Sequence, residues 1–155
     1  MALVHLKVEA VALDWKGHPL VVLRELDGKR AVFIWIGIAE ATAISMVLEG
    51  QDPPRPFTHD LLMSILRDAG GKVEQVVITN VQVDTYYADL TLTYGERSVT
   101  FDCRPSDAIA LALRDNAPLS IREDLLQRLE RERQEREESD EPELTIIDTG
   151  ETTVH

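Results

Sequence analysis

Hydrophobic and polar positions alternate along much of the first 36 residues and again between residues 73 and 103. Alternation with a period of two is typical of strands that bury one face. The pattern predicts six strands, over Leu3–Leu13, Pro19–Glu25, Arg30–Ile36, Val73–Val83, Tyr86–Tyr94 and Arg97–Cys103. Turn signals at Asp27-Gly28, Asp84-Thr85 and Gly95-Glu96 join consecutive strands into hairpins.

Helical spacing replaces this alternation in two central segments. The first, IAEATAISMVLEG, is rich in small residues and ends at Gly50, so we expect a closely packed helix. The second begins at Thr58, which we expect to act as its N-cap, and ends at Gly70-Gly71. One helical face of this second segment is apolar and is predicted to face the core: Leu61, Leu62, Ile65, Leu66 and Ala69.

Two further helices are predicted in the last third of the chain. Ser106 is expected to cap a short helix over Asp107–Arg114, whose apolar interior indicates burial. After a short extended segment, PLSI, a last helix begins near Glu123 and loses its apolar stripe beyond Leu129. The segment 139–155 reads as a tail, in which LTII could pair with a sheet edge.

Together these elements predict an α+β fold. The sheet is expected to be mixed and mainly antiparallel, with about six strands and three to four helices. Residues 1–126 would form the domain, and residues 127–155 an acidic helical extension with a flexible tail.

Composition narrows the possible functions. The formal net charge of the 155 residues is −12, and half of it lies on residues 126–155. Neither part has the broad basic field that supplies affinity for nucleic acid, so such a function would need a local basic site, metal ions or both. No apolar run approaches the ~20 residues that span a bilayer, and the alternating N-terminus is unlike a secretory signal. The single cysteine, Cys103, fits a reducing cytoplasm.

Two predicted helix starts share one local design, Arg55-Pro56-Phe57-Thr58-His59-Asp60 and Arg104-Pro105-Ser106-Asp107. In the structural interpretation, the hydroxyl group caps the helix and the acid complements the helix dipole, worth ~0.3–1 kcal/mol. In the functional interpretation, backbone N–H groups and the arginine bind phosphate. The neighbouring aspartate would then require a divalent cation to bridge it to the phosphate. Both interpretations remain open at this stage.

Further side chains near these helix starts could take part in chemistry. Asp102 and Asp107 flank the strand-to-helix turn, where two carboxylates could converge on one cation. His59 could act as a general base or a metal ligand, or be simply exposed. Cys103 is expected to be a small core residue rather than a nucleophile. Four aromatic residues could stack nucleobases, although strand aromatics more often belong to the core: Trp15, Trp35, Tyr86 and Tyr87.

Three segments together resemble the bifunctional nuclease domain family: IWIGIAEATAI, PRPFTHDLL and DCRPSDAIALALR. The resemblance covers roughly residues 1–126, and both Arg-Pro motifs match without a gap. The matching positions are Glu40, Pro54, Arg55, Pro56, Thr58, His59, Asp60, Asp102, Arg104, Pro105, Ser106 and Asp107. The family is credited with activity on DNA and RNA. The resemblance therefore implies an α+β fold, a homodimer and a nuclease activity.

From the residues and the resemblance, we predict a cytoplasmic nuclease that hydrolyses phosphodiester bonds in DNA and RNA with the help of Mg²⁺ or Mn²⁺. The candidate catalytic residues are His59, Asp60 and Asp107. The candidate phosphate-binding residues are Arg55, Thr58, Arg104 and Ser106, and the candidate metal ligands are Glu40, Asp102 and Asp107. The alternative is a non-enzymatic dimeric module that binds a small anion or a protein partner at the same helix starts.

Overall fold

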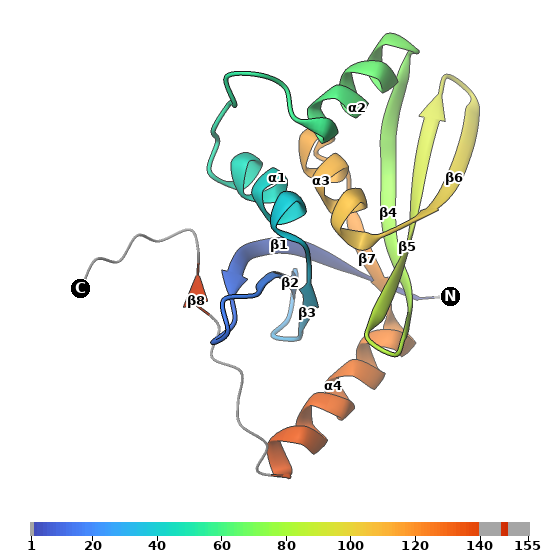
Figure 1. Cartoon of the computed structure of the whole chain (residues 1–155). Helices are drawn as coiled ribbons and strands as arrows, with labels where there is room; N and C mark the ends of the chain where they lie inside the picture. Colours follow the sequence, from blue (N-terminus) through green and yellow to red (C-terminus); the bar gives the residue numbers. More distant parts are fainter. Residues whose placement is uncertain (1, 140–146, 149–155) are drawn as a thin grey trace.

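A single mixed sheet organises the computed structural model, which describes residues 2–139 and 147–148 (Figure 1). Seven strands follow the order β3-β2-β1-β7-β4-β5-β6, and a two-residue strand, β8, pairs with β1. The strands are β1 (Leu3–Leu13), β2 (Pro19–Glu25), β3 (Ala31–Trp35), β4 (Gly71–Gln82), β5 (Thr85–Tyr94), β6 (Arg97–Cys103), β7 (Leu119–Arg122) and β8 (Ile147–Asp148). The helices are α1 (Ile38–Leu48), α2 (Thr58–Asp68), α3 (Pro105–Asp115) and α4 (Glu123–Glu138).

The sheet consists of two antiparallel groups that β7 joins. Strands β1 to β3 form one group and β4 to β6 the other. Strand β7 runs antiparallel to β1 and parallel to β4. This topology confirms the predicted α+β class and the mixed, mainly antiparallel sheet. The segment PLSI, expected only to be extended, supplies the first three residues of β7, Leu119–Ile121, which are buried where the strand pairs with both groups.

The predicted tail contributes one short pairing to the sheet. Ile147 and Asp148 lie opposite Leu13 and Ala12 of β1. The rest of the LTII segment lies outside the described residues. No helix in the described part of the chain is both long and apolar enough to cross a membrane.

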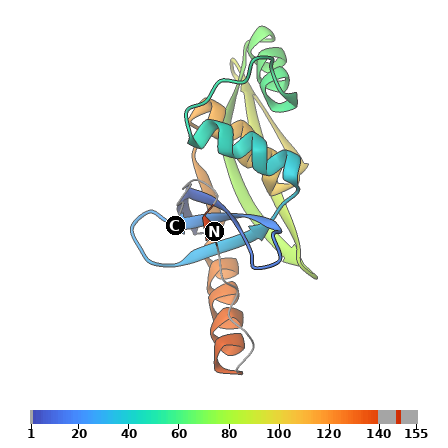
Figure 2. The same ribbon diagram turned by 60° about the vertical axis from the view of Figure 1, so that its left-hand side comes forward.

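Helices α1, α2 and α3 lie together on one face of the sheet (Figures 1 and 2). Both α1 and α2 contact α3, which also contacts β4 and β5. Residues 105–112 of α3 are buried except Asp107, as the apolar sequence predicts. Helix α1 buries Ala41, Ala43 and Ile44, and its small side chains allow the close packing that we expected.

Helix α4 follows β7 directly and projects away from the sheet (Figure 2). Only Leu125 and Leu126 are buried, and Leu129 packs partly against the core. This agrees with the predicted loss of the apolar stripe, because a helix without such a stripe gains little from packing.

Both predicted N-caps are wrong. Helix α2 has its N-cap at Phe57, one residue before Thr58, and helix α3 has its N-cap at Arg104, two residues before Ser106. In neither helix does the side chain of the N-cap residue form a capping hydrogen bond. In α2, the carboxylate of Asp60 reaches back and accepts a hydrogen bond from the Phe57 N–H at 2.9 Å. Helix α3 begins with a proline, whose fixed φ suits the first helical position and whose missing N–H needs no cap.

The predicted apolar face of α2 points largely away from the core. Leu61, Leu62 and Ile65 are between 46% and 59% exposed. Leu66 is buried as predicted, and the other buried residues of the helix are His59 and Met63. The helix lies at the end of the helical layer and contacts only α3 and β4 closely, so a narrow stripe is enough to pack it.

The turn between β4 and β5 falls one residue earlier than expected. Val83 and Asp84 occupy it, both with positive φ, at 46° and 61°. A two-residue turn of type I′ needs this conformation at both positions, and Asp tolerates it better than Val. Val83 is 97% exposed at the tip, so no packing contact explains its presence there.

Candidate functional site

Four of the predicted site residues meet at the beginnings of α1, α2 and α3: Glu40, His59, Arg104 and Asp107. We call them the Arg104 cluster. The Arg104 guanidinium donates from Nη2 to Glu40 Oε1 at 2.7 Å and from Nε to Asp107 Oδ2 at 2.9 Å. The other carboxylate oxygen of Asp107 lies 2.9 Å from His59 Nε2. A continuous chain of charged and polar contacts therefore links three helices.

Local sequence explains how these side chains reach one another. Glu40, His59 and Asp107 each lie in the first turn of their helix, and Arg104 is the N-cap residue of α3. A residue before proline is held in an extended conformation, and Arg104 has φ −69° and ψ 138°. Its side chain therefore leaves the helix and lies between the two carboxylates. The acids also complement the positive ends of their helix dipoles.

The cluster combines a buried imidazole with an exposed guanidinium. His59 is buried, whereas the Arg104 side chain is 65% exposed. The hydrogen bond and charge of Asp107, followed by those of Glu40, raise the pKa of Arg104 above its ordinary value. Arg104 is therefore permanently charged and reachable from solvent, although two carboxylates share its charge.

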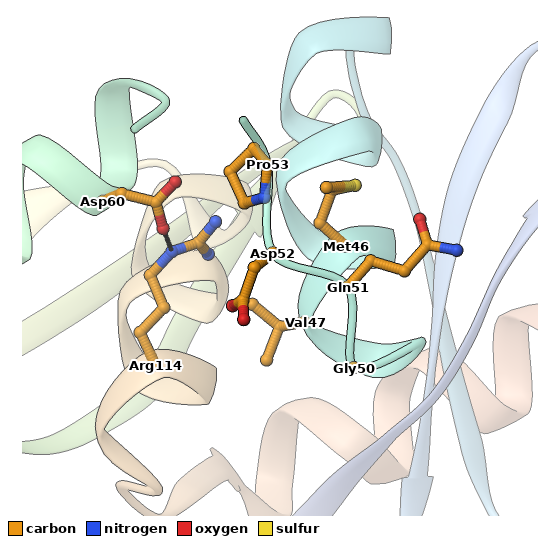
Figure 3. Close-up of a pocket in the computed structure, with 8 residues that line it drawn as sticks. All are labelled: Met46, Val47, Gly50, Gln51, Asp52, Pro53, Asp60 and Arg114. Carbon is orange, nitrogen blue, oxygen red and sulfur yellow. Dashed lines mark hydrogen bonds and ion pairs between the residues drawn. The ribbon is translucent and has the colours of Figure 1, made fainter. Parts of the chain in front are cut away.

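Asp60 lies outside this cluster and forms an ion pair with Arg114, whose Nε lies 2.8 Å from Asp60 Oδ1 (Figure 3). Arg114 is almost fully buried, and its Nη1 and Nη2 donate to the carbonyl oxygens of Ala110 and Ala43. Burial would raise the pKa of Asp60. The hydrogen bonds from Arg114 and the Phe57 N–H, with the charge of Arg114, outweigh burial and hold the pKa below its usual range. This pair ties the three helices together.

Sequence reasoning did not single out Arg114. The available signal was a lone arginine at the end of the apolar run AIALAL, where a charge needs a buried partner.

A pocket of about 250 Å³ lies beside the Asp60–Arg114 pair and is also lined by Met46, Asp52 and Pro53 (Figure 3). The guanidinium nitrogens of Arg114 already have partners in Asp60 and two carbonyl groups. Because the Asp60 carboxylate already neutralises this cation and places a negative charge beside the pocket, the pocket is poorly suited to bind phosphate.

The remaining predicted residues are placed apart from one another. The side chains of Arg55 and Thr58 are exposed and have no hydrogen bond or ion pair among the described residues. Ser106 is buried in the first turn of α3. Asp102 is exposed on β6, directly opposite Asp89 of β5.

The carboxylates do not converge as a cation would require. Phe101 pairs with the core residue Leu90, so Asp102, one residue later, points to the sheet face opposite the helices and away from Asp107. Arg104 lies between Glu40 and Asp107. No group of three His, Cys, Asp or Glu side chains in residues 2–139 could hold a metal ion. As the side chains stand, the predicted ligands do not fit a divalent cation.

A larger groove, of about 580 Å³, opens beside the Arg104 cluster. It lies between the turn after β1, the end of β3, the β4–β5 turn and the first turn of α3. We call it the Trp35 groove; its lining includes Trp35, Ile38, Asp84, Tyr86, Arg104 and Ser106. Arg104 belongs to both the groove and the cluster, so a ligand in the groove would reach the cluster.

The aromatic residues divide between surface and core. Trp15 and Trp35 are exposed, whereas Tyr86 and Tyr87 are partly buried. Burial raises the pKa of the Tyr86 hydroxyl. Burial, with nearby acids, raises the pKa of Cys103 to about 11, so the thiol stays protonated near neutral pH. This agrees with the prediction that Cys103 is not a nucleophile.

Comparison with known proteins gives consistent matches. The family model described as the bifunctional nuclease domain matches residues 21–134. An uncharacterized protein of Mycobacterium tuberculosis is 40% identical over 111 residues, which cover 72% of this chain and 66% of that protein. Bifunctional nuclease 1 of Arabidopsis thaliana is 30% identical, and bifunctional nuclease 2 of Oryza sativa subsp. japonica is 31% identical. Each plant match covers 70% of this chain and 34% of the plant protein, so the chain spans about a third of their length.

Proposed function

The chain belongs to the bifunctional nuclease domain family, and from this premise we propose that it is a nuclease that hydrolyses phosphodiester bonds in DNA and RNA. The observation that carries the proposal is the contact between His59 Nε2 and Asp107 Oδ1 at 2.9 Å, beside the exposed guanidinium of Arg104. A histidine oriented by a carboxylate, next to a reachable cation, is a suitable arrangement for hydrolysing a phosphodiester. The single cysteine supports a reducing cytoplasm as the place of action.

Each member of the pair has a distinct role in this proposal. Asp107 accepts the Nε2–H hydrogen bond of the neutral imidazole and thereby fixes the tautomer whose lone pair is on Nδ1. His59 takes a proton from the attacking water at Nδ1, and the leaving sugar oxygen takes a proton from solvent water. The water oxygen bonds to phosphorus as the bond to the leaving oxygen breaks. Arg104 neutralises the charge that develops on the phosphoryl oxygens.

A divalent cation has no step in this proposal, because the predicted ligands do not converge on one point. Mg²⁺ or Mn²⁺ stays a prediction from the sequence and the resemblance. Cleavage in excess chelator, compared with cleavage in added Mg²⁺ or Mn²⁺, decides whether one is needed.

We propose further that the protein acts as a homodimer through the exposed apolar side of α2. Phe57, Leu61, Leu62 and Ile65 are exposed on this helix or at its N-cap. Apolar side chains concentrated on one helix in this way are typical of an interaction surface. A second copy of the chain would bury the same residues on both partners, as a two-fold interface requires.

The test of nuclease function is Asp107→Asn, assayed for cleavage of plasmid DNA and of RNA. We expect cleavage to be lost, because Asn supplies no negative charge to stabilise the protonated imidazole. The free energy of unfolding should fall by no more than about 1 kcal/mol, since Asn retains an acceptor oxygen. Asp124→Asn is the matched control, because Asp124 also lies in the first turn of a helix and also pairs with an arginine, Arg122.

The outcomes separate the two candidate functions. Equal cleavage by wild type and the folded Asp107→Asn protein would indicate a contaminant or another site and would remove Asp107 from the mechanism. Binding of nucleic acid or of a small anion without any cleavage by the wild type would favour the non-enzymatic module instead.

A further inference from the structure

Trp35 occupies an unusual position for a strand tryptophan. It ends the edge strand β3, is 44% exposed and lines the Trp35 groove. Indole rings are usually buried to a larger extent, because they carry much apolar area. An exposed indole in a groove leaves apolar surface that a flat, apolar ligand face could cover.

The edge of this ring is fixed by a buried carboxylate. Trp35 Nε1–H donates to Asp14 Oδ2 at 3.0 Å, and Asp14 is only 5% exposed. The other oxygen of Asp14 accepts the backbone N–H groups of Lys16 and His18, both at 2.9 Å. Burial would raise the pKa of Asp14, but these hydrogen bonds and that of Trp35 hold it below its usual range. The ring is thus oriented before any ligand arrives.

The groove around the ring carries little net charge. Arg104, with its charge shared by two carboxylates, and Asp84 are its charged lining residues, together with the titratable His18. Phosphate attraction alone would therefore bind a strand weakly here, and stacking on the indole would have to supply much of the affinity. A base within a duplex has both faces covered by its neighbours, whereas an unpaired base exposes them to an aromatic side chain.

We propose that the Trp35 groove binds a single-stranded segment of nucleic acid, with one unpaired base stacked on Trp35 and a neighbouring phosphate at Arg104. This inference rests on the proposed function, since it selects single strands as the substrate class of the same site. It makes Trp35 a binding residue and Asp14 the residue that positions its ring.

The test uses the fluorescence of Trp35 itself. Trp15 is the second tryptophan of the chain, and it does not line the groove. In a protein carrying Trp15→Phe and Asp107→Asn, Trp35 is the only tryptophan and so the only side chain excited at the long-wavelength edge of the absorption band, and the probe is not cut. We titrate this protein with a single-stranded oligothymidylate of about eight nucleotides, and separately with a duplex of equal length. The single strand should quench the emission at lower concentration than the duplex.

Affinity measured by an independent method gives the second readout. In the Asp107→Asn background, Trp35→Ala should weaken single-strand binding by about 5- to 150-fold, the range of one base stacked on an aromatic side chain. Trp35→Phe should retain part of the affinity, and Trp15→Ala should bind like the parent. Circular dichroism checks that each variant is folded.

Three results would overturn the groove proposal: no change in Trp35 emission with saturating single strand, equal affinity of Trp35→Ala and the parent, or preference for the duplex. None of these depends on cleavage, so the proposed nuclease function is judged separately. If Trp35 responds to single strands and the wild-type protein cuts nothing, the groove proposal stands and the nuclease proposal fails.

Discussion

Arg104 has two carboxylate neighbours and still leaves most of its side chain in solvent. Its contacts to Glu40 and Asp107 orient the guanidinium but compete with any phosphate for it. Asp107 also contacts His59, whereas the described side-chain contact of Glu40 is with Arg104 alone. The two acids should therefore respond differently to substitution.

We expect Glu40→Gln to tighten nucleic-acid binding up to about 5-fold, because it removes one competing charge from an exposed ion pair worth ~0.2–1 kcal/mol. Cleavage should continue. Glu49→Gln is the control. Glu49 is the C-cap residue of the same helix, is exposed, and has no side-chain partner among the described residues. The measurement is binding at low salt together with cleavage rate. Loss of cleavage with binding retained would contradict this prediction and support Glu40 as a metal ligand.

The Asp60–Arg114 pair should make stability depend on pH. The folded-state pKa of Asp60 is depressed. Its contribution is therefore present above the ordinary aspartate pKa and is lost as the pH falls through the lower, folded-state pKa. We expect Asp60→Asn to lower the free energy of unfolding by about 1–3 kcal/mol near neutral pH, since the buried Arg114 loses a charged partner.

Urea unfolding near pH 7 and near pH 3 measures this difference, which should shrink at the acidic end. Asp68→Asn is the matched control, since Asp68 is an exposed aspartate on the same helix with no side-chain partner among the described residues. A difference between wild type and Asp60→Asn that stayed constant with pH would show that Asp60 does not act through its charge.

At the scale of elements, α2 both supplies the site and exposes its apolar side. Its buried side carries His59 into the Arg104 cluster, and its exposed side carries Leu61 and Ile65. Because the two sides of the helix are different, a dimer interface on its exposed side would not cover the Arg104 cluster. The helix could therefore join two copies without blocking either site.

We expect Ile65→Lys to turn a dimer into a monomer, since the substitution places like charges on both partners of a two-fold interface. Analytical ultracentrifugation at micromolar concentration should show about twice 17.4 kDa for the wild type and about 17.4 kDa for the variant. Leu26→Lys is the control, because Leu26 is equally exposed in the loop after β2. A wild-type monomer, or an unchanged dimer in the Ile65→Lys variant, would contradict the proposed interface.

At the scale of the whole molecule, charge is distributed unevenly. The segment Arg131–His155 carries nine acids and three bases. Among residues 131–139, the part of this segment whose burial the structure describes, none belongs to the buried core. The net negative charge of this segment should nevertheless repel nucleic acid from the Arg104 cluster, where Arg104 is the exposed cation.

We expect removal of residues 131–155 to change the melting temperature little and to tighten nucleic-acid binding at about 50 mM salt, with a smaller gain at about 200 mM. A second truncation after Ser139 keeps α4 and separates the effect of the helix from that of the tail. Unfolding of either truncated protein would show that the removed segment, including β8, is structural. Unchanged affinity at both salt concentrations would contradict the electrostatic inhibition.

The sequence by itself determined most of the elements, though not β7, and the neighbourhood of the site. Six strands, four helices and two Arg-Pro helix starts follow from periodicity and turn chemistry, because these depend on neighbours within a few residues. Local rules also placed Arg104 and Asp107 next to each other, since they are three residues apart across one helix start.

Only the tertiary structure decided which distant side chains meet. Asp60 and Asp107 occupy equivalent local positions, yet Asp60 pairs with Arg114 and Asp107 with His59, because the packing of α2 against α3 sets those distances. The direction of the α2 apolar side and the exposure of Trp35 likewise could not be predicted from residues nearby in the sequence. A hydrophobic pattern records that a side chain can be buried, whereas the neighbouring elements determine whether anything covers it.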